Sequence, residues 1–360
     1  MRIIKLIFLL FLSHLKSLAQ DPTFTAFHYN KMEYNPSYGG ADGPGKIGIR
    51  TSGKVSFYPI RGPFNYSNVS LDYSPCKLSI VQVGLGLLVN KETQGDGFLK
   101  STKVGLNTGL TVRLKRKLSL SLGLRPNLLF QSVDWNEFTF TDQLDPIRGI
   151  TKVSANQNAN LDLSSVTNWD FGLRVNSYRN KHAYFMLGLG VFNAFEPQIG
   201  LLNRYTLPRR ISAQFTFIRK SKKFENVSYH YYTRFDVQNN FKYGAINFEG
   251  FFGSKISAGA GLKVPVFNPY GTKNNLFPSL LFAYQASPVL KFYTSVETNV
   301  LGVNLAGKTK TFEVGIVLVS IKKMCSIKDV KNVYKYESRD FSSQIGCPKF
   351  SNTDGKIESF

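Results

Sequence analysis

Residues 104–114 read VGLNTGLTVRL, and this stretch decides the fold class. Its even-numbered positions carry aliphatic residues and one threonine, whereas its odd-numbered positions carry glycine, asparagine, threonine and arginine. Successive side chains of a β-strand point to opposite faces, so this strand has one apolar and one polar face. A face of large aliphatic side chains backed by small and polar ones is typical of a barrel wall between lipid and a hydrated lumen.

The same alternation recurs along residues 46–321 and predicts an all-β, transmembrane outer-membrane barrel. We expect fourteen antiparallel strands, at 46–58, 65–73, 79–91, 100–114, 117–129, 169–177, 182–192, 210–218, 227–237, 243–250, 255–264, 279–286, 290–300 and 311–319. The pattern is weaker at 243–250 and 290–300, so a twelve-stranded barrel is an alternative.

The lengths of the connections predict how the barrel is oriented. An even number of strands places both ends of the barrel on the same side. Connections after even-numbered strands are short, and the longest connections, 130–168, 193–209 and 265–278, follow odd-numbered strands. We therefore expect short periplasmic turns, longer extracellular loops, and periplasmic N- and C-termini.

Residues 1–19 resemble an export signal. Arg2 and Lys5 supply positive charge, Ile3 to Leu12 supply an apolar core, and small residues precede a cleavage point before Gln20. The apolar core is too short to span about 30 Å of hydrocarbon, and no later stretch is long enough for a transmembrane helix. The aromatic content of 14% suits the aromatic girdles of an outer-membrane barrel.

Two segments lie outside the predicted wall. Residues 20–45 form an N-terminal plug or periplasmic segment, and residues 322–360 form a periplasmic tail; either could instead insert into the lumen. Cys325 and Cys347 in the tail could form a disulfide in an oxidising periplasm, or these two and Cys76 could all be free.

The chain is strongly basic, with a formal net charge of +22 that falls to +19 without Arg2, Lys5 and Lys16. An exported chain does not meet nucleic acid, so acidic protein, lipopolysaccharide phosphates and cell-wall polymers are the candidate partners, with membrane lipid around the wall. Basic residues cluster in two predicted periplasmic turns: Lys115, Arg116, Lys117, Lys220, Lys222 and Lys223. They could dock an acidic partner, or they could simply be solvated turn residues.

Four cations are predicted to face the lumen: Arg113, Arg125, Arg174 and Lys263. They could be hydrated charges of an ordinary barrel interior, or they could hold an acidic peptide or plug through charge-assisted hydrogen bonds.

Signatures of catalysis are weak. Ser228 and His230 share a strand face and are the nearest serine–histidine pair, which leaves an outer-membrane hydrolase as a minor alternative. Zinc spacing, phosphate loops and paired carboxylates do not stand out. We therefore expect no enzyme activity, no metal site and no cofactor.

The predicted mature chain opens with a motif that consists of Gln20, Asp21, Pro22, Phe24, Asn30, Asn35, Pro36, Tyr38 and Gly40. This motif resembles the start of the PorP/SprF family of type IX secretion outer-membrane proteins. The chain departs from the family pattern at Ser37 and Gly39, both small-for-small changes, and the resemblance extends to about Ile321. The Asn-Pro and Gly-Gly pairs have turn chemistry, which suggests either a tight bend before the first strand or a segment that plugs the lumen or grips a partner.

The resemblance implies a role in secretion and surface attachment of a large adhesin-type client, as in gliding motility. It also implies periplasmic type IX components or a peptidoglycan-binding lipoprotein as partners. The basic tail suggests the SprF-like branch. A diffusion channel or small-solute transporter is the alternative function, and conductance separates the two.

Overall fold

The computed structural model describes residues 23–320 except 44, 59–61, 76–80, 96–98, 116, 134–142, 146–148, 151–162, 181–182, 201–203, 222–223, 225–226, 240, 254, 268–275 and 300–309. It also describes 349–350 and 357–358. The predicted signal peptide, Gln20 to Pro22, and Cys325 with Cys347 lie outside the described residues.

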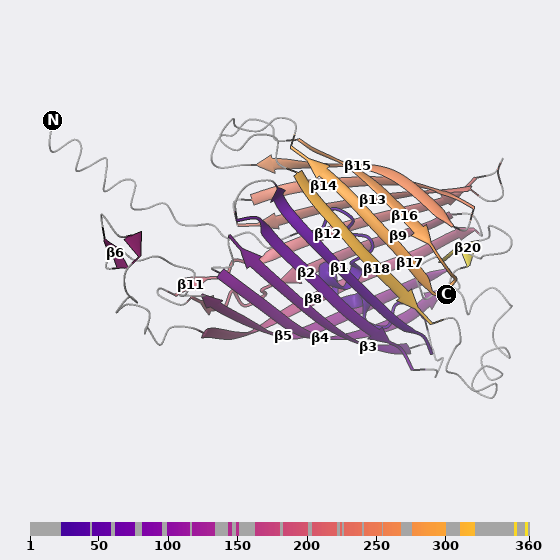
Figure 1. Cartoon of the computed structure of the whole chain (residues 1–360). Helices are drawn as coiled ribbons and strands as arrows, with labels where there is room; N and C mark the ends of the chain where they lie inside the picture. The colour runs from indigo at the N-terminus through magenta and orange to yellow at the C-terminus, as the bar shows by residue number, and fades with distance from the viewer. Residues whose placement is uncertain are drawn as a thin grey trace.

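A closed antiparallel barrel of fourteen strands dominates the structure (Figure 1). Its strands are β1 (Ile47–Tyr58), β2 (Phe64–Tyr73), β3 (Val81–Gln94), β4 (Leu99–Lys115), β5 (Leu118–Val133), β8 (Leu163–Asn180), β9 (Ala183–Phe192), β12 (Arg210–Lys220), β13 (Val227–Gln238), β14 (Phe241–Phe252), β15 (Ile256–Phe267), β16 (Phe277–Gln285), β17 (Leu290–Thr298) and β18 (Lys310–Val319). Consecutive barrel strands pair, and β1 pairs with β18 to close the wall. The predicted barrel and its strand count are confirmed, and the twelve-stranded alternative is wrong.

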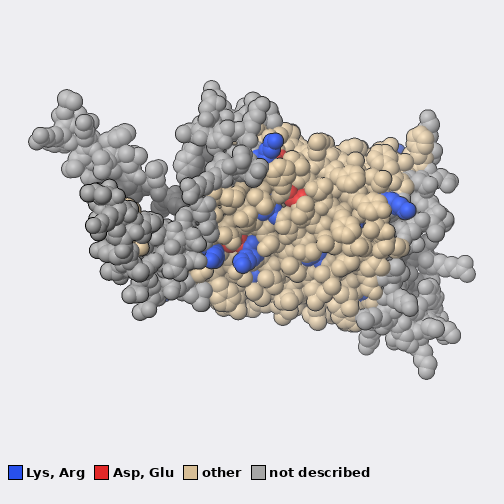
Figure 2. Space-filling view, in the orientation of Figure 1, with Lys and Arg blue, Asp and Glu red and all other residues tan. Residues whose placement is uncertain are grey.

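The alternation of the sequence becomes the two faces of the wall. On β4, Leu106 and Leu114 are exposed on the outside, whereas Asn107 between them is buried on the inside. The same pattern of exposed apolar and buried polar positions runs along β2, β3 and β12. An apolar outer surface with a polar interior is the arrangement that lipid outside the barrel stabilises. In Figure 2 the visible wall is largely free of charged side chains, and the few present gather mostly toward its left end.

The predicted connection 130–168 is too long. β5 continues to Val133 and β8 begins at Leu163, and the two strands pair as far as Ser132 with Leu163. Outward positions in this extension include Phe130 but also Ser132, Ser165 and Thr167, so the apolar stripe is interrupted there. The hydrogen-bond ladder needs no apolar stripe, which is why hydrophobic patterning missed it.

Three two-stranded pairs lie outside the barrel sheet: β6 (Leu144–Asp145) with β7 (Gly149–Ile150), β10 (Gln198–Ile199) with β11 (Tyr205–Thr206), and β19 (Lys349–Phe350) with β20 (Ile357–Glu358). The segment that carries β10 and β11 folds over the inner wall. Ile199 and Leu207 pack on the inward side chains Leu129 and Val166. This segment therefore narrows the end of the lumen that carries the long connections, here called the loop end.

Residues 23–43, here called the N-terminal segment, lie inside the barrel (Figure 1). They contain the short helices α2 (Lys31–Tyr34) and η1 (Pro36–Tyr38). All of these residues except Thr23 and Lys31 are buried. Among the described residues, no helix is long and apolar enough to cross a membrane.

Candidate functional site

The inner wall carries a row of glycines that runs across five neighbouring strands. Gly84 of β3 pairs with Gly109 of β4, which pairs with Gly123 of β5. Gly123 pairs in turn with Gly172 of β8, and Gly172 pairs with Gly190 of β9. We call these five residues the glycine row.

The glycine row makes room for the main chain of the N-terminal segment. A Cβ atom at Gly84 or Gly109 would collide with the backbone of Gly39, and one at Gly123 would collide with the backbone of Pro36 and Ser37. A Cβ at Gly172 would meet Asn35 and Ser37, and one at Gly190 would meet the carbonyl oxygen of Tyr34. Glycine is required here because two backbones approach more closely than any side chain allows.

The Asn-Pro and Gly-Gly motif forms the bend that lies on this row. Asn35 Oδ1 accepts a hydrogen bond of 2.9 Å from the amide of Ser37, and Asn35 Nδ2 donates one of 2.9 Å to the carbonyl of Leu173. Pro36 occupies the first position of η1, where no amide hydrogen is needed. Gly40 has a φ of +69°, a conformation that favours glycine. The motif therefore shapes a turn and attaches it to the barrel wall.

Two of the predicted lumen cations bind the backbone of the N-terminal segment. Arg125 Nη1 donates a 2.8 Å hydrogen bond to the carbonyl of Met32, and Arg125 Nε donates one of 2.8 Å to Asp170. Arg174 Nη2 donates a 3.2 Å hydrogen bond to the carbonyl of Ser37. Both guanidinium groups are buried, so these charge-assisted bonds are shielded from water.

The other two predicted lumen cations contact the wall or lie near its end. Lys263 Nζ lies 2.8 Å from Glu297 Oε1 on a neighbouring part of the wall. Arg113 is half-buried on the inner face, near the barrel end opposite the loop end. Whether any of the four holds a separate partner stays a prediction.

Two further arginines hold the segment and were missing from the sequence prediction. The guanidinium of Arg234 lies 4.0 Å from the ring centre of Tyr34 and 4.7 Å from that of Phe27. Arg210 Nη2 lies 3.9 Å from Glu33 Oε1. Both arginines occupy inward positions of strands whose side chains alternate between apolar and polar. The alternation that placed Arg125 on the inner face therefore placed these two arginines there as well.

Carboxylates of β14 and β18 hold the start of the segment. Glu313 of β18 accepts hydrogen bonds from the amides of Thr25, at 2.7 Å, and Ala26, at 3.1 Å. Glu249 of β14 accepts one of 2.9 Å from the hydroxyl of Tyr29 and lies 2.6 Å from His28 Nε2.

The six motif residues that the structure describes are all buried in the lumen: Phe24, Asn30, Asn35, Pro36, Tyr38 and Gly40. Phe24 packs on Tyr66, with ring centres 4.8 Å apart. Asn30 donates to the hydroxyl of Tyr293 at 2.9 Å and accepts from Ser52 at 2.8 Å. The motif residues are thus contact residues between the segment and its barrel.

Ser228 and His230 do meet, at 3.0 Å between Oγ and Nε2. The other ring nitrogen of His230 lies 2.9 Å from the hydroxyl of Tyr232, where a hydrolase triad has a carboxylate. His28 of the N-terminal segment stacks on Tyr232 with ring centres 4.0 Å apart. The geometry therefore resembles a packed polar contact between wall and segment more than a site open to substrate.

The predicted basic turns are only partly described. Lys115 and Lys117 are exposed at the end of the barrel opposite the loop end, here called the turn end. Lys220 differs from the expectation, because it is the last residue of β12 and its side chain is buried on the inner face. Arg116, Lys222 and Lys223 lie outside the described residues.

A closed antiparallel barrel with an apolar outer wall and a polar interior defines an outer-membrane protein. The particular family follows from a family model, described as type IX secretion system membrane protein PorP/SprF, which matches residues 16–318. The chain therefore belongs to the PorP/SprF family of outer-membrane proteins of the type IX secretion system.

Solved structures of other barrels are similar only in outline. The CymD monoaromatic hydrocarbon channel is 10% identical, with 81% of this chain and 92% of that chain covered and a TM-score of 0.47. The toluene transporter TbuX of Ralstonia pickettii is 11% identical, with coverage of 81% and 92% and a TM-score of 0.44. A FadL homologue of Pseudomonas aeruginosa is also 11% identical, with coverage of 76% and 89% and a TM-score of 0.43. No curated protein sequence matches the chain.

Proposed function

We propose that this barrel is a non-enzymatic, sealed component of the type IX system that supports secretion and surface attachment of a large adhesin-type client. The observation that carries the proposal is the occupied lumen. A diffusion channel needs a continuous hydrated path, whereas here residues 23–43 cross the interior and contact opposite walls through Arg125 and Glu313. The barrel then serves as a rigid outer-membrane support rather than as a pore.

The contacts of the N-terminal segment favour permanent occupancy. The segment packs aromatic side chains on aromatic residues of the wall, including Phe24 on Tyr66 and Tyr29 on Tyr293, whose rings stack at 4.4 Å. Its backbone accepts hydrogen bonds from buried arginines, which are stronger than bonds between neutral groups. Withdrawal would expose these charges and the glycine row together.

The exposed basic residues of the turn end suit the periplasmic partner. With the short turns in the periplasm, the exposed Lys115 and Lys117 face that compartment. A cluster of like charge attracts an acidic surface and accelerates its association. We propose that a periplasmic type IX component or a peptidoglycan-binding lipoprotein docks here, while the loop end faces the client.

Conductance of the purified protein in a planar bilayer tests the sealed barrel. We expect no steady openings from the wild-type chain under conditions in which a known porin conducts. Steady, large, ion-permeable openings would overturn the proposal and favour the channel. In the native bacterium, deletion of the gene should remove the client from the cell surface, and an unchanged amount of surface client would contradict the proposed role.

A further inference from the structure

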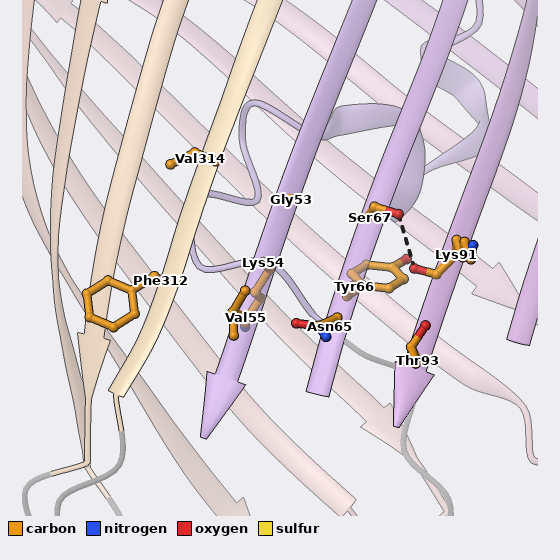
Figure 3. Close-up of a pocket in the computed structure, with 10 residues that line it drawn as sticks. All are labelled: Gly53, Lys54, Val55, Asn65, Tyr66, Ser67, Lys91, Thr93, Phe312 and Val314. Atoms are coloured by element: carbon orange, nitrogen blue, oxygen red, sulfur yellow. Dashed lines mark hydrogen bonds between the residues drawn. The ribbon is translucent and has the colours of Figure 1, made fainter. Parts of the chain in front are cut away.

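The outer wall carries a hollow of about 310 Å³ where β18, β1, β2 and β3 lie side by side (Figure 3). Gly53 of β1 lies at its centre and pairs with Val314 on one side and Ser67 on the other. A Cβ atom at Gly53 would meet nothing within 4 Å. The hollow exists because glycine occupies a position whose neighbours carry side chains.

The two sides of the hollow differ in chemistry. Val55, Phe312 and Val314 form one side and are apolar. The other side, on β2 and β3, carries side chains that donate hydrogen bonds: Asn65, Ser67, Thr93 and the ammonium group of Lys91. Figure 3 shows these groups on opposite sides of Gly53. A ligand that fits this hollow therefore has an apolar part beside a polar, negatively charged part.

The height of the hollow on the wall indicates which ligand that is. Ser67 pairs with Lys91. The next outward residues toward the middle of the barrel are Val69 on β2 and Val89 on β3, which also pair with each other. Two residues along a strand span about 7 Å, so Lys91 lies just beyond the apolar band, at the level of lipid headgroups. The charged side chains of the wall in Figure 2 also gather toward this loop end.

We propose that this hollow binds one phosphorylated lipid, with an acyl chain against Val55, Phe312 and Val314 and a phosphate against Lys91 and Ser67. The Lys91 ammonium provides a charge-assisted hydrogen bond to a phosphate oxygen. The Ser67 hydroxyl, which donates to the carbonyl of Lys91 at 3.4 Å, would rotate to donate to the bound phosphate. The hollow lies at the loop end, which the proposed orientation places in the outer leaflet. The lipid is accordingly the phosphorylated glycolipid of lipopolysaccharide, and this assignment of leaflet rests on that orientation.

Binding of lipid A to the purified full-length barrel in detergent, measured by native mass spectrometry, tests the site. We expect the wild type to prefer bisphosphorylated lipid A over its dephosphorylated form. Lys91→Ala should weaken binding of the phosphorylated form about fivefold, because a lysine near an anionic lipid contributes roughly 1 kcal/mol. Gly53→Leu should fill the hollow and reduce binding of both forms at least tenfold.

β14 offers matched controls. Gly244 also has nothing within 4 Å of its Cβ position, and the exposed Lys242 lies two residues away on the same face. Gly244→Leu and Lys242→Ala should leave binding unchanged. Equal binding of both forms of lipid A, equal losses in the controls, or equally tight binding of phosphatidylglycerol would overturn the inference. None of these outcomes depends on conductance. A failure of lipid binding therefore does not contradict the proposal of a sealed barrel, and the observation of an open channel does not contradict the lipid site.

Discussion

Replacing Gly123 by alanine should loosen the N-terminal segment while the barrel wall stays intact. The added Cβ would collide with backbone atoms of Pro36 and Ser37, which cannot rotate away as a side chain could. The bend must therefore lift from the wall. Its hydrogen bonds from Arg174 to the carbonyl of Ser37 and from Asn35 to the carbonyl of Leu173 would then break.

The magnitude follows from those two bonds. A buried hydrogen bond to a charged group contributes about 2 kcal/mol and a neutral one about 1 kcal/mol, so docking of the segment weakens by about 3 kcal/mol. Since each 1.4 kcal/mol is a factor of ten, the population with an undocked segment rises roughly 100-fold. The wall itself keeps its ladder, because Gly123 pairs with Gly109 and Gly172 through its backbone.

Two assays measure this change. Chymotrypsin should cleave after Tyr34, which is 1% exposed in the docked segment, much faster in Gly123→Ala than in the wild type. Planar bilayers should show openings in the variant that the wild type lacks. Gly53→Ala is the control, because its Cβ points into open space outside the barrel. If Gly123→Ala folds, as judged by heat-modifiable gel mobility, yet matches the wild type in both assays, the reasoning about the glycine row is refuted.

The remaining predictions concern other contacts of the wall. Arg125→Met removes one of the two cations beside Asp170 in the part of the chain that the structure describes and leaves the Lys103 ammonium at 3.0 Å. This substitution should lower the free energy of unfolding by about 3 kcal/mol in urea titrations, whereas Arg209→Met, at an exposed site, should change it by less than about 0.5 kcal/mol. Glu313→Gln removes the charge that accepts the amides of Thr25 and Ala26, so cleavage after Tyr34 should accelerate several-fold; an unchanged rate would show that this wall does not hold the segment. Lys115→Glu combined with Lys117→Glu should weaken capture of an acidic periplasmic partner, while Lys242→Glu on another part of the wall should not, and equal capture by all variants would end the docking proposal. Ser228→Ala should leave ester hydrolysis at the wild-type background, and a wild-type activity abolished by this substitution would contradict the non-enzymatic assignment.

The barrel class could be predicted from sequence because its signal is local. A strand that separates lipid from water must alternate apolar and polar side chains, and each strand shows this pattern without reference to its neighbours. Even the weaker stretches became complete strands, with 12 residues in β14 and 9 in β17. Strand ends beyond the apolar band, as at Val133 and Leu163, carry no such signal and were missed.

The interior was predicted less completely. Alternation placed Arg125 and Arg174 on the inner face, and the turn chemistry of Asn35 and Pro36 was visible in the sequence. Their contact was not visible, because residues 35–38 and 174 are far apart in the chain and meet only when the barrel closes. Arg210 and Arg234 carried the same alternation but gained their significance from the aromatic and acidic residues of the segment beside them.

The sequence alone determined that this chain forms a barrel and which side chains face lipid, since period-two alternation is a property of each strand by itself. The tertiary structure decided what fills the barrel. Gly84, Gly109, Gly123, Gly172 and Gly190 are scattered single residues in the sequence, and only the hydrogen-bonded register between strands aligns them into one row. The backbone of the N-terminal segment, which is distant in the sequence, occupies the space beside these glycines. Such a long-range contact leaves no signal in the local sequence pattern of either part.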